Sequence, residues 1–214
     1  MNIPSGVTEL GERTFYGCHA LEKIILPQGI QHLPTNVFYG CKSLISIKLP
    51  LCIKSIGSGA FSVCSSLVSV NFKELKELES IAGSAFRKCS ALVNVDLLEL
   101  DKLKEIGSDA FQECSLLTDF AFPPNMTIIE FKTFYKCSSL ANVKLPASLQ
   151  TIVMGAFSMC SAHMRFEAND DISDKLLRRI IMNVKRCDRN GSVKVVNSKG
   201  ELFAAPPLRK YSYK

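Results

Sequence analysis

One motif, Phe-x-x-Cys, recurs seven times along this chain at nearly constant spacing. Its phenylalanines are separated by steps of 23, 23, 25, 25, 23 and 23 residues, and each is followed three positions later by a cysteine. The seven pairs begin with Phe15 and Cys18 and end with Phe157 and Cys160. Self-similarity at a fixed period of 20–50 residues is the signature of a repeat architecture, in which each unit stacks on the next.

The residues between these pairs follow the same period. A leucine stands three positions after each of the first six cysteines, and an alternating apolar pair such as Ile47 and Leu49 follows it. Period-two alternation predicts a short strand with one buried face. Four of these pairs are followed by proline, which fits a strand end because proline cannot donate to a ladder: Pro27, Pro50, Pro123 and Pro146. Further apolar residues stand eight and five positions before each phenylalanine.

One such unit cannot bury its apolar side, but stacked units share a continuous core. The segment from Ile56 to Cys64 is too short for a full helix, so a helical or 3₁₀ turn is expected there. The two 25-residue steps arise from longer connections at residues 73–78 and 98–103. The sequence therefore predicts an α/β repeat solenoid. It should have a short parallel β-sheet, helical or 3₁₀ turns on the convex side, and a small C-terminal α+β cap.

The unit resembles the BspA-like, or treponemal-type, leucine-rich repeat family. That family's consensus joins Ala-Phe-x-x-Cys to Leu-x-x-Val-x-Leu-Pro and Leu-x-x-Ile-Gly, and residues 57–67, GSGAFSVCSSL, match it closely. The resemblance covers residues 3–162. It implies a leucine-rich repeat solenoid, and a role in adhesion to host proteins and cells like that attributed to many surface members.

The two ends of the array depart from the repeat. The strand expected before Ile3 is missing, so we expect either a fragment or a partner that covers the first unit. At the other end, Ser173 or Asp174 could cap a helix running to about Cys187. Residues 193–196 and 201–203 are typical of a hairpin. We therefore divide the chain into a repeat array at 1–168, a capping helix and hairpin at 169–205, and a basic tail at 206–214.

The outward face of the predicted strands is the natural binding surface of a solenoid. Its candidate residues are mixed in sign, small and polar, and they include no aromatic cluster of the kind found at binding hot spots. A face that is merely solvated is the alternative. The candidates are Lys23, Ile25, Ser46, Lys48, Ser69, Asn71, Asn94, Asp96, Asp119, Asn142, Lys144 and Arg165, flanked by Ala121 and Glu167.

The net charge of +6 lies wholly in the last quarter of the chain, because residues 1–163 carry 14 Lys/Arg and 14 Asp/Glu. A charge asymmetry of this kind suggests separate roles for the two parts. The predicted helix and tail either cap the array with solvated charges, dock an acidic protein, or contact nucleic acid or an anionic membrane. The last is disfavoured because the positive charge does not extend along the repeats and the helix lacks Trp or Phe. The candidate basic residues are Lys175, Arg178, Arg179, Lys185, Arg186, Arg209 and Lys210.

The seven in-register cysteines are the most conspicuous chemical groups. Their spacing does not fit a metal site, whose ligand pairs normally stand two to four residues apart. A disulfide between neighbouring units is conceivable but would need distortion. The favoured interpretation is a buried, reduced ladder of small hydrophobic side chains, with the off-pattern Cys52 and Cys187 as possible exposed thiols. The histidines His19, His32 and His163 occupy three different repeat phases and should not converge, so we expect neither an active site nor a cofactor.

These features predict a non-catalytic protein–protein interaction scaffold. The unpaired cysteines and the absence of a signal peptide favour a structural subunit of a larger intracellular, cytoplasmic assembly. The alternative, favoured by the family resemblance, is a cell-surface adhesion or ligand-binding protein whose leader lies outside this sequence. The sequence does not identify the partner or the oligomeric state.

Overall fold

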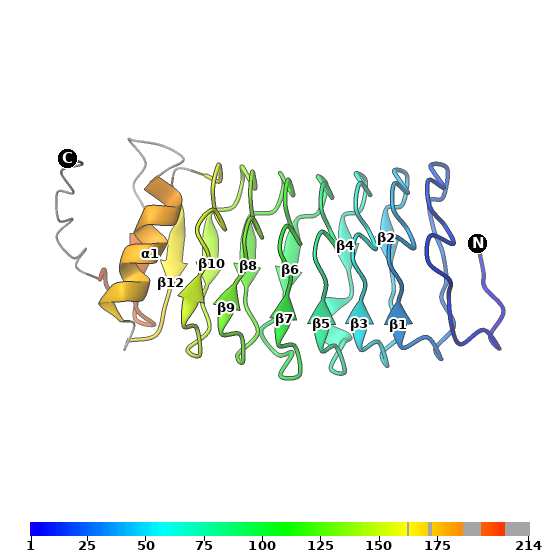
Figure 1. The fold of residues 1–214 in the computed structure, drawn as a ribbon, viewed down its shortest axis with the longest axis horizontal. Helices are drawn as coiled ribbons and strands as arrows, with labels where there is room; N and C mark the ends of the chain where they lie inside the picture. The colour runs from blue at the N-terminus through cyan, green and yellow to red at the C-terminus, as the bar shows by residue number, and fades with distance from the viewer. Residues whose placement is uncertain (162, 171–172, 186–193, 204–214) are drawn as a thin grey trace.

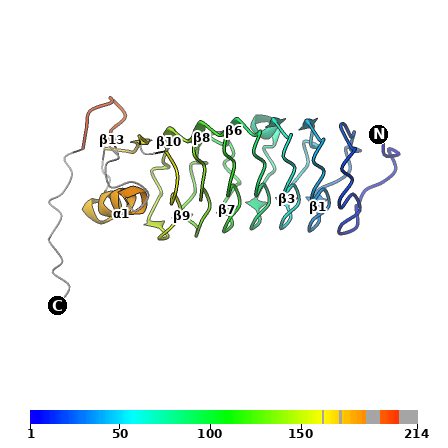
Figure 2. The ribbon, with the colours of Figure 1, turned by 90° about the horizontal axis from the view of Figure 1, so that it is seen from above.

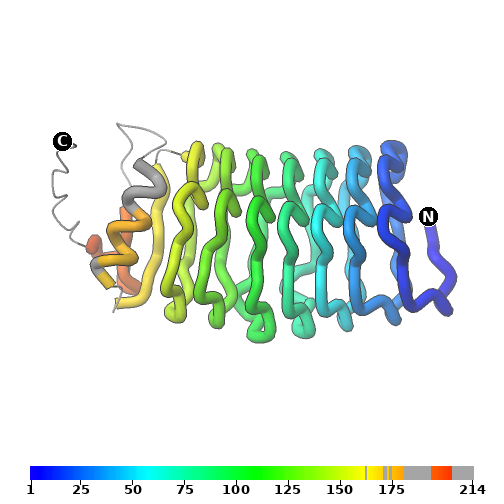
Figure 3. The backbone as a smooth tube through the Cα atoms, in the orientation of Figure 1, coloured from blue at the N-terminus to red at the C-terminus, as the bar shows by residue number. Residues whose placement is uncertain are grey.

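The chain coils into a stack of similar turns, which Figures 1 and 3 show as a row of loops along one long axis. The computed structural model describes residues 1–161, 163–170, 173–185 and 194–203. We name each coil by its phenylalanine, so that the Phe61 coil contains Phe61 and Cys64. The predicted repeat solenoid is confirmed, and strands from successive coils pair in parallel.

The predicted strands form the first of two rows. Each strand of this row buries one apolar residue, from Ile47 to Val195, and the residues beside it point outward, except in β13, where Val196 is buried as well. Isolated bridges from Asn2 to Ile25 and from Ile25 to Lys48 extend the row toward the N-terminus. The row consists of β2 (Ser46–Ile47), β4 (Ser69–Val70), β6 (Asn94–Asp96), β8 (Asp119–Ala121), β10 (Asn142–Lys144), β12 (Arg165–Glu167) and β13 (Lys194–Val196).

A second row of strands, which the sequence did not predict, lies on the opposite side of the stack (Figure 2). Each strand has only two residues, of which one is buried, so no period-two alternation could develop. The buried residue is the apolar position five before each phenylalanine, such as Ile56 or Ile81. The row consists of β1 (His32–Leu33), β3 (Ser55–Ile56), β5 (Ser80–Ile81), β7 (Glu105–Ile106), β9 (Ile128–Ile129) and β11 (Thr151–Ile152).

The Phe-x-x-Cys segments form hydrogen-bonded turns that stack on one another. Alternate N–H groups donate within the coil to the residue three positions back, as Cys64 does to Phe61 at 3.1 Å. The others donate to the next coil, as Phe61 does to the Ala85 carbonyl at 2.8 Å. The expected 3₁₀ character is therefore present as single turns rather than a helix, because every second N–H bonds to the neighbouring coil. The one 3₁₀ helix of the described residues, η1 (Phe72–Glu74), lies in a longer connection.

The phenylalanine rings form a continuous stack through the core. Consecutive rings from Phe15 to Phe157 lie 5.2–5.8 Å apart between centroids, with planes within 12° of parallel. The six rings from Phe38 onward are fully buried. This offset stacking is a favourable arrangement for aromatic pairs.

The last described coil is covered by α1 (Asp174–Lys185) and β13. Ser173 caps α1, because its Oγ accepts the N–H of Leu176 at 3.3 Å, and the helix buries Leu176, Leu177 and Ile180. The expected hairpin is present as a bridge between Val196 and Leu202, but β13 also pairs in parallel with β12 and so continues the first row. The predicted division into three domains remains a prediction. The tail at 206–214 and the end of the predicted helix near Cys187 lie outside the described residues.

Close stacking leaves no room for a side chain at Gly107. A Cβ built there would lie 2.5 Å from the Gly83 nitrogen of the preceding coil. Gly107→Ala should therefore lower the free energy of unfolding by about 1–3 kcal/mol, as overpacking typically does. Urea denaturation measures the change. Gly6→Ala is the matched control, since its Cβ would meet nothing within 4 Å, and an equal loss in both variants would contradict the stacking argument.

Candidate protein-binding surface

The candidate strand-face residues lie together in two outward rows. Asn94, Asp119 and Asn142 stand opposite one another in register, and Arg165 and Lys194 continue this row. The second row runs through Asp96, Ala121, Lys144 and Glu167 in the same register. Toward the N-terminus, the first row continues through Ser69, Ser46 and Lys23, and the second through Asn71, Lys48 and Ile25. Between the rows lie buried apolar residues such as Val95 and Phe120. We call this surface the strand face.

Charges on the strand face are largely paired with one another. Lys144 Nζ lies 3.5 Å from Glu167 Oε1, and Asn142 Nδ2 donates to Asp119 Oδ1 at 2.7 Å. Lys73, from the longer connection, lies 2.9 Å from Asp96. Partial burial acts to raise the pKa of Asp96, but hydrogen bonds from Lys73 and the Leu98 N–H, with the positive charges nearby, lower it overall. The hydrogen bond to Asp96 raises the pKa of Lys73. Several charges around the middle of the face are therefore offset by a neighbour, although cations outnumber carboxylates on the strand face as a whole.

A shallow hollow of about 490 Å³ opens at the middle of the strand face. Its floor includes Val95, Phe120 and the small side chain of Ala121, and its rim carries Asn94, Asp96, Asp119, Asn142, Lys73 and Lys144. The hollow arises where alanine stands between two longer side chains, Asp96 and Lys144, in the second row. Ala121 was the sequence signal for it, but only the register shows which side chains surround that position.

Asn71, a strand-face candidate, uses its side chain to bond to the backbone of the preceding coil. Its Oδ1 accepts the Leu49 N–H at 2.8 Å and its Nδ2 donates to the Leu49 carbonyl at 3.1 Å. These bonds tie the end of one coil to the next. Asn71 is therefore a structural residue rather than a free contact residue.

Asn71→Ala should lower the free energy of unfolding by about 1–3 kcal/mol, because it leaves the Leu49 backbone groups without their partner. Asn94→Ala is the matched control, since Asn94 is exposed and should change stability by less than about 0.5 kcal/mol. Thermal and urea denaturation of both variants checks this. Equal stability in the two variants would show that Asn71 does not hold the coils together.

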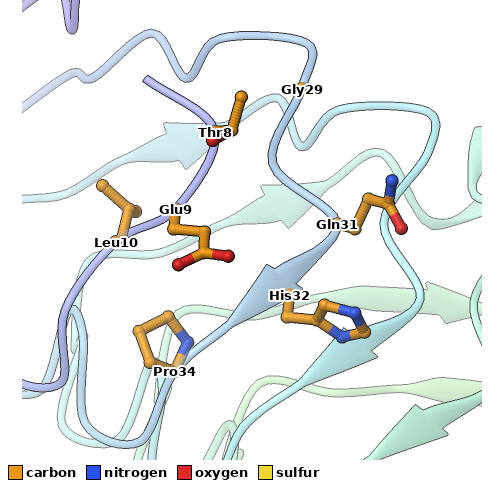
Figure 4. Close-up of a pocket in the computed structure, with 7 residues that line it drawn as sticks. All are labelled: Thr8, Glu9, Leu10, Gly29, Gln31, His32 and Pro34. Carbon is orange, nitrogen blue, oxygen red and sulfur yellow. The ribbon is translucent and has the colours of Figure 1, made fainter.

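A second hollow, of about 530 Å³, lies on the side of the second strand row near the N-terminus (Figure 4). Thr8, Glu9 and Leu10 of the first coil line one side of it, and Gln31, His32 and Pro34 line the other. In the next pair of coils, the Gly57 N–H donates to the Leu33 carbonyl at 2.8 Å. Pro34 occupies the position equivalent to Gly57, but it has no N–H and so cannot make this bond to the first coil. This explains why the two coils separate here. None of the candidate binding residues borders this hollow.

The basic candidates lie partly on α1. Lys175, Arg178 and Arg179 are exposed, on the helix whose apolar residues cover the last coil. Lys185 ends α1. Arg186, Arg209 and Lys210 lie outside the described residues, so their part in the predicted basic segment stays a prediction.

The cysteine ladder is buried from Cys41 to Cys137, but the prediction is wrong at its first member, since Cys18 is exposed, and Cys160 is only partly buried. The thiols also form hydrogen bonds that the sequence did not predict. Cys64 Sγ donates to the Phe38 carbonyl of the preceding coil at 3.1 Å. The same bond recurs in each coil from Cys41 to Cys160, at 2.9–3.2 Å. Burial raises the pKa of Cys41 to about 11, with the neighbouring Cys18 adding to the shift, and burial raises the pKa of Cys89 well above its ordinary value. These thiols stay protonated and serve as links between coils.

The described residues contain no group of three or more His, Cys, Asp or Glu side chains placed to hold a metal ion. His19 bonds to the Gly40 carbonyl through Nδ1 at 2.8 Å, and His32 bonds to Ser55 Oγ through Nδ1 at 2.8 Å. These contacts are local links between neighbouring coils.

Alkylation by iodoacetamide should separate the cysteines by exposure. Cys18, which is exposed, should react first, whereas Cys64, Cys89 and Cys114 should stay unmodified until the chain unfolds. Because Cys41 is fully buried, its labelling in the folded protein should stay far slower than that of Cys18 even at pH 10, although that pH approaches its raised pKa of about 11. Peptide mass spectrometry with and without urea measures each site. If Cys89 of the folded protein were labelled as fast as Cys18, its thiol would not be buried between the coils.

Comparisons with known proteins identify the class. A model described as the BspA type leucine-rich repeat region, with 6 copies, matches residues 1–99 and 71–175. The chain therefore belongs to the BspA-type leucine-rich repeat family, as its motif suggested. The comparison with curated proteins gave no match. None of the described helices is long and apolar enough to cross a membrane.

Three solved structures share the fold. A leucine-rich repeat protein from T. pallidum is 24% identical, with 85% of this chain and 81% of that chain covered and a TM-score of 0.54. A leucine-rich cell surface protein from Faecalibacterium prausnitzii is 26% identical (78% and 46% covered, TM-score 0.56). A leucine-rich repeat protein from Eubacterium ventriosum is 28% identical (75% and 42% covered, TM-score 0.63). This chain thus spans less than half the length of the second and third proteins.

Membership places the chain in a broad functional class. Leucine-rich repeats generally mediate protein–protein interaction and are generally non-catalytic scaffolds.

Proposed function

We propose that this chain is a non-catalytic scaffold that binds a protein partner through the strand face. The supporting observation is the pair of in-register outward rows with a hollow between them, at Asn94, Asp119 and Asn142. A continuous polar face with an apolar floor suits a protein surface, because it offers hydrogen-bonding groups around a patch that loses water on contact. Since several charges around the hollow are paired with one another, we expect recognition there by shape and hydrogen bonds.

The exposed cations of α1 form a separate candidate contact. Lys175, Arg178 and Arg179 project from the helix that covers the last coil, and they suit an acidic protein partner. Nucleic acid fits less well, because residues 1–163 carry equal numbers of basic and acidic side chains and offer no continuous basic track.

For the setting, we propose a structural subunit of an intracellular assembly. The buried cysteines from Cys41 to Cys137 are thiols that form no disulfide, and thiols persist most readily in the reducing cytosol. The second candidate is a cell-surface binding protein, which the Faecalibacterium prausnitzii cell surface protein favours. The exposed thiol of Cys18 separates the two. A membrane-impermeant maleimide should label it only after lysis if the protein is intracellular, and in intact cells if it is on the surface.

Charge reversal on the strand face tests the binding surface. Lysine cross-linking in the native source should first join the partner to Lys48, Lys73 or Lys144 of the strand face. Asp119→Arg should then weaken retention of that partner at least about tenfold, as loss of a central contact does. Co-purification at a series of partner concentrations measures the change in affinity.

Glu105→Arg on β7 is the matched control, since it makes the same change of charge on the opposite row of strands. It should leave binding intact. Cross-links confined to Lys54 and Lys104, beside the second row, would contradict the strand-face proposal, as would equal weakening by both variants.

A further inference from the structure

A groove runs along the stacked turns, outside the strand face. One wall is built from the residue two positions after each phenylalanine, and the floor carries the serine that follows each cysteine. Together they enclose about 590 Å³. The lining consists of Val63, Lys88, Glu113, Lys136 and Met159 on the wall, and Ser65, Ser90, Ser115 and Ser138 on the floor. We call this feature the serine groove.

The serine groove follows the long axis of the solenoid. It extends from the Phe61 coil to the Phe157 coil, four steps of roughly 4.8 Å each. A groove of about 19 Å accommodates an extended segment of about six residues at roughly 3.3 Å per residue. The shape therefore suits a peptide lying along the axis.

The groove floor offers hydrogen-bond acceptors. Ser90 Oγ donates to the Ser65 carbonyl at 3.2 Å, and Ser115 Oγ donates to the Ser90 carbonyl at 3.4 Å. Because each hydroxyl proton is used between coils, the lone pairs of the oxygen remain for N–H donors of an incoming chain.

Aromatic and basic side chains gather at the C-terminal end of the groove. Lys132 Nζ lies 4.9 Å from the Phe131 ring centroid and 5.4 Å from that of Tyr135, and Lys136 Nζ lies 5.4 Å from the same tyrosine ring. Phe131 is 44% exposed, and Met154 and Met159 are 62% and 51% exposed. We call these six residues, Phe131, Lys132, Tyr135, Lys136, Met154 and Met159, the aromatic–lysine patch.

The two lysines of this patch lack anionic partners. Neither Lys132 nor Lys136 forms an ion pair with any carboxylate of the described residues. The nearest acidic side chain on the same wall, Glu113, is already bound by Gln112 Nε2 at 2.8 Å and lies 3.9 Å from Lys88. The patch therefore presents two lysines that form no salt bridge with the described residues, beside exposed apolar surface.

The repeat itself shows that the fold does not require these side chains. The Phe61 coil carries Ser58, Gly59 and Ser62 where the Phe134 coil carries Phe131, Lys132 and Tyr135. Both coils stack with the same turn hydrogen bonds, such as Phe61 to Ala85 and Phe134 to Ala156, each at 2.8 Å. Large apolar groups exposed without a structural need are typical of interaction sites, and tyrosine is enriched at binding hot spots.

We propose that the aromatic–lysine patch and the serine groove bind an extended acidic segment of a partner protein. Its carboxylates pair with Lys132 and Lys136, an adjacent apolar side chain packs on Phe131 and Met159, and the rest of the segment follows the serine floor toward Val63. This surface is separate from the strand face, so a partner could occupy both.

The repeat supplies the test variant. The triple substitution Phe131→Ser, Lys132→Gly and Tyr135→Ser installs the residues of the Phe61 coil and should leave the melting temperature within a few degrees of wild type. A phage-displayed library of random octapeptides is selected on the wild-type protein. The selected peptides are synthesised with a fluorescent label, and their Kd is measured by anisotropy on wild type, on the triple variant, on Asp119→Arg, and on the control Lys54→Ser with Lys104→Ser.

The selected peptides should be enriched in Asp or Glu next to an apolar residue. They should bind the triple variant at least tenfold more weakly and bind Asp119→Arg and the lysine control as they bind wild type. Affinity should fall with added salt, because two ion pairs are exposed. Selected peptides without acidic residues, peptides that bind the triple variant as tightly as wild type, or a selection that enriches none would each overturn the proposal. Weaker binding to Asp119→Arg alone would assign the peptides to the strand face.

Discussion

Every other feature of this structure depends on the register between one coil and the next. The Phe-x-x-Cys turns donate backbone N–H groups forward, as Phe61 does to Ala85, and the cysteine thiols from Cys41 onward donate backward, as Cys64 does to Phe38. The stacked rings between them exclude water from these bonds. A coil that slipped by one residue would lose the ring stack, the thiol bonds and the backbone bonds together, because all three belong to the same nine-residue segment.

This constraint explains why the inside of the solenoid is uniform and the outside is variable. Inward positions must match the neighbouring coils, so Phe, Cys and Leu recur with little change. Outward positions face solvent and the same position of adjacent coils, so the exposed residues Glu12, Ser58 and Phe131 can replace one another. The repeat thus holds the backbone while leaving whole rows of side chains open to carry binding chemistry.

The two outer surfaces use that freedom differently. On the strand face, Lys73, Asp96, Asn142 and Asp119 are paired among themselves, so a partner would have to compete for or add to an existing network. On the turns, Lys132 and Lys136 contact aromatic rings rather than carboxylates. The proposed partner-binding roles follow from this contrast: polar shape recognition on the first surface, and recognition of negative charge with apolar contact on the second.

The sequence by itself determined the coil length and the buried positions, because the spacing of Phe, Cys and Leu repeats. It also determined the first row of strands, because a period-two alternation of apolar residues has only one buried face. It also located the capping helix from Ser173 and the apolar stripe that includes Leu176 and Ile180. It could not show the second row of strands, since two residues such as Ser55 and Ile56 are too few to form a pattern, and it treated the thiols as hydrophobic groups only. The tertiary structure alone decided which side chains of neighbouring coils lie in contact. Asn71 is a structural residue because it bonds to Leu49, and Phe131, Lys132 and Tyr135 form one surface with Met159. Such neighbours are some 22 to 28 residues apart in the chain, so they come into contact only when the coils stack.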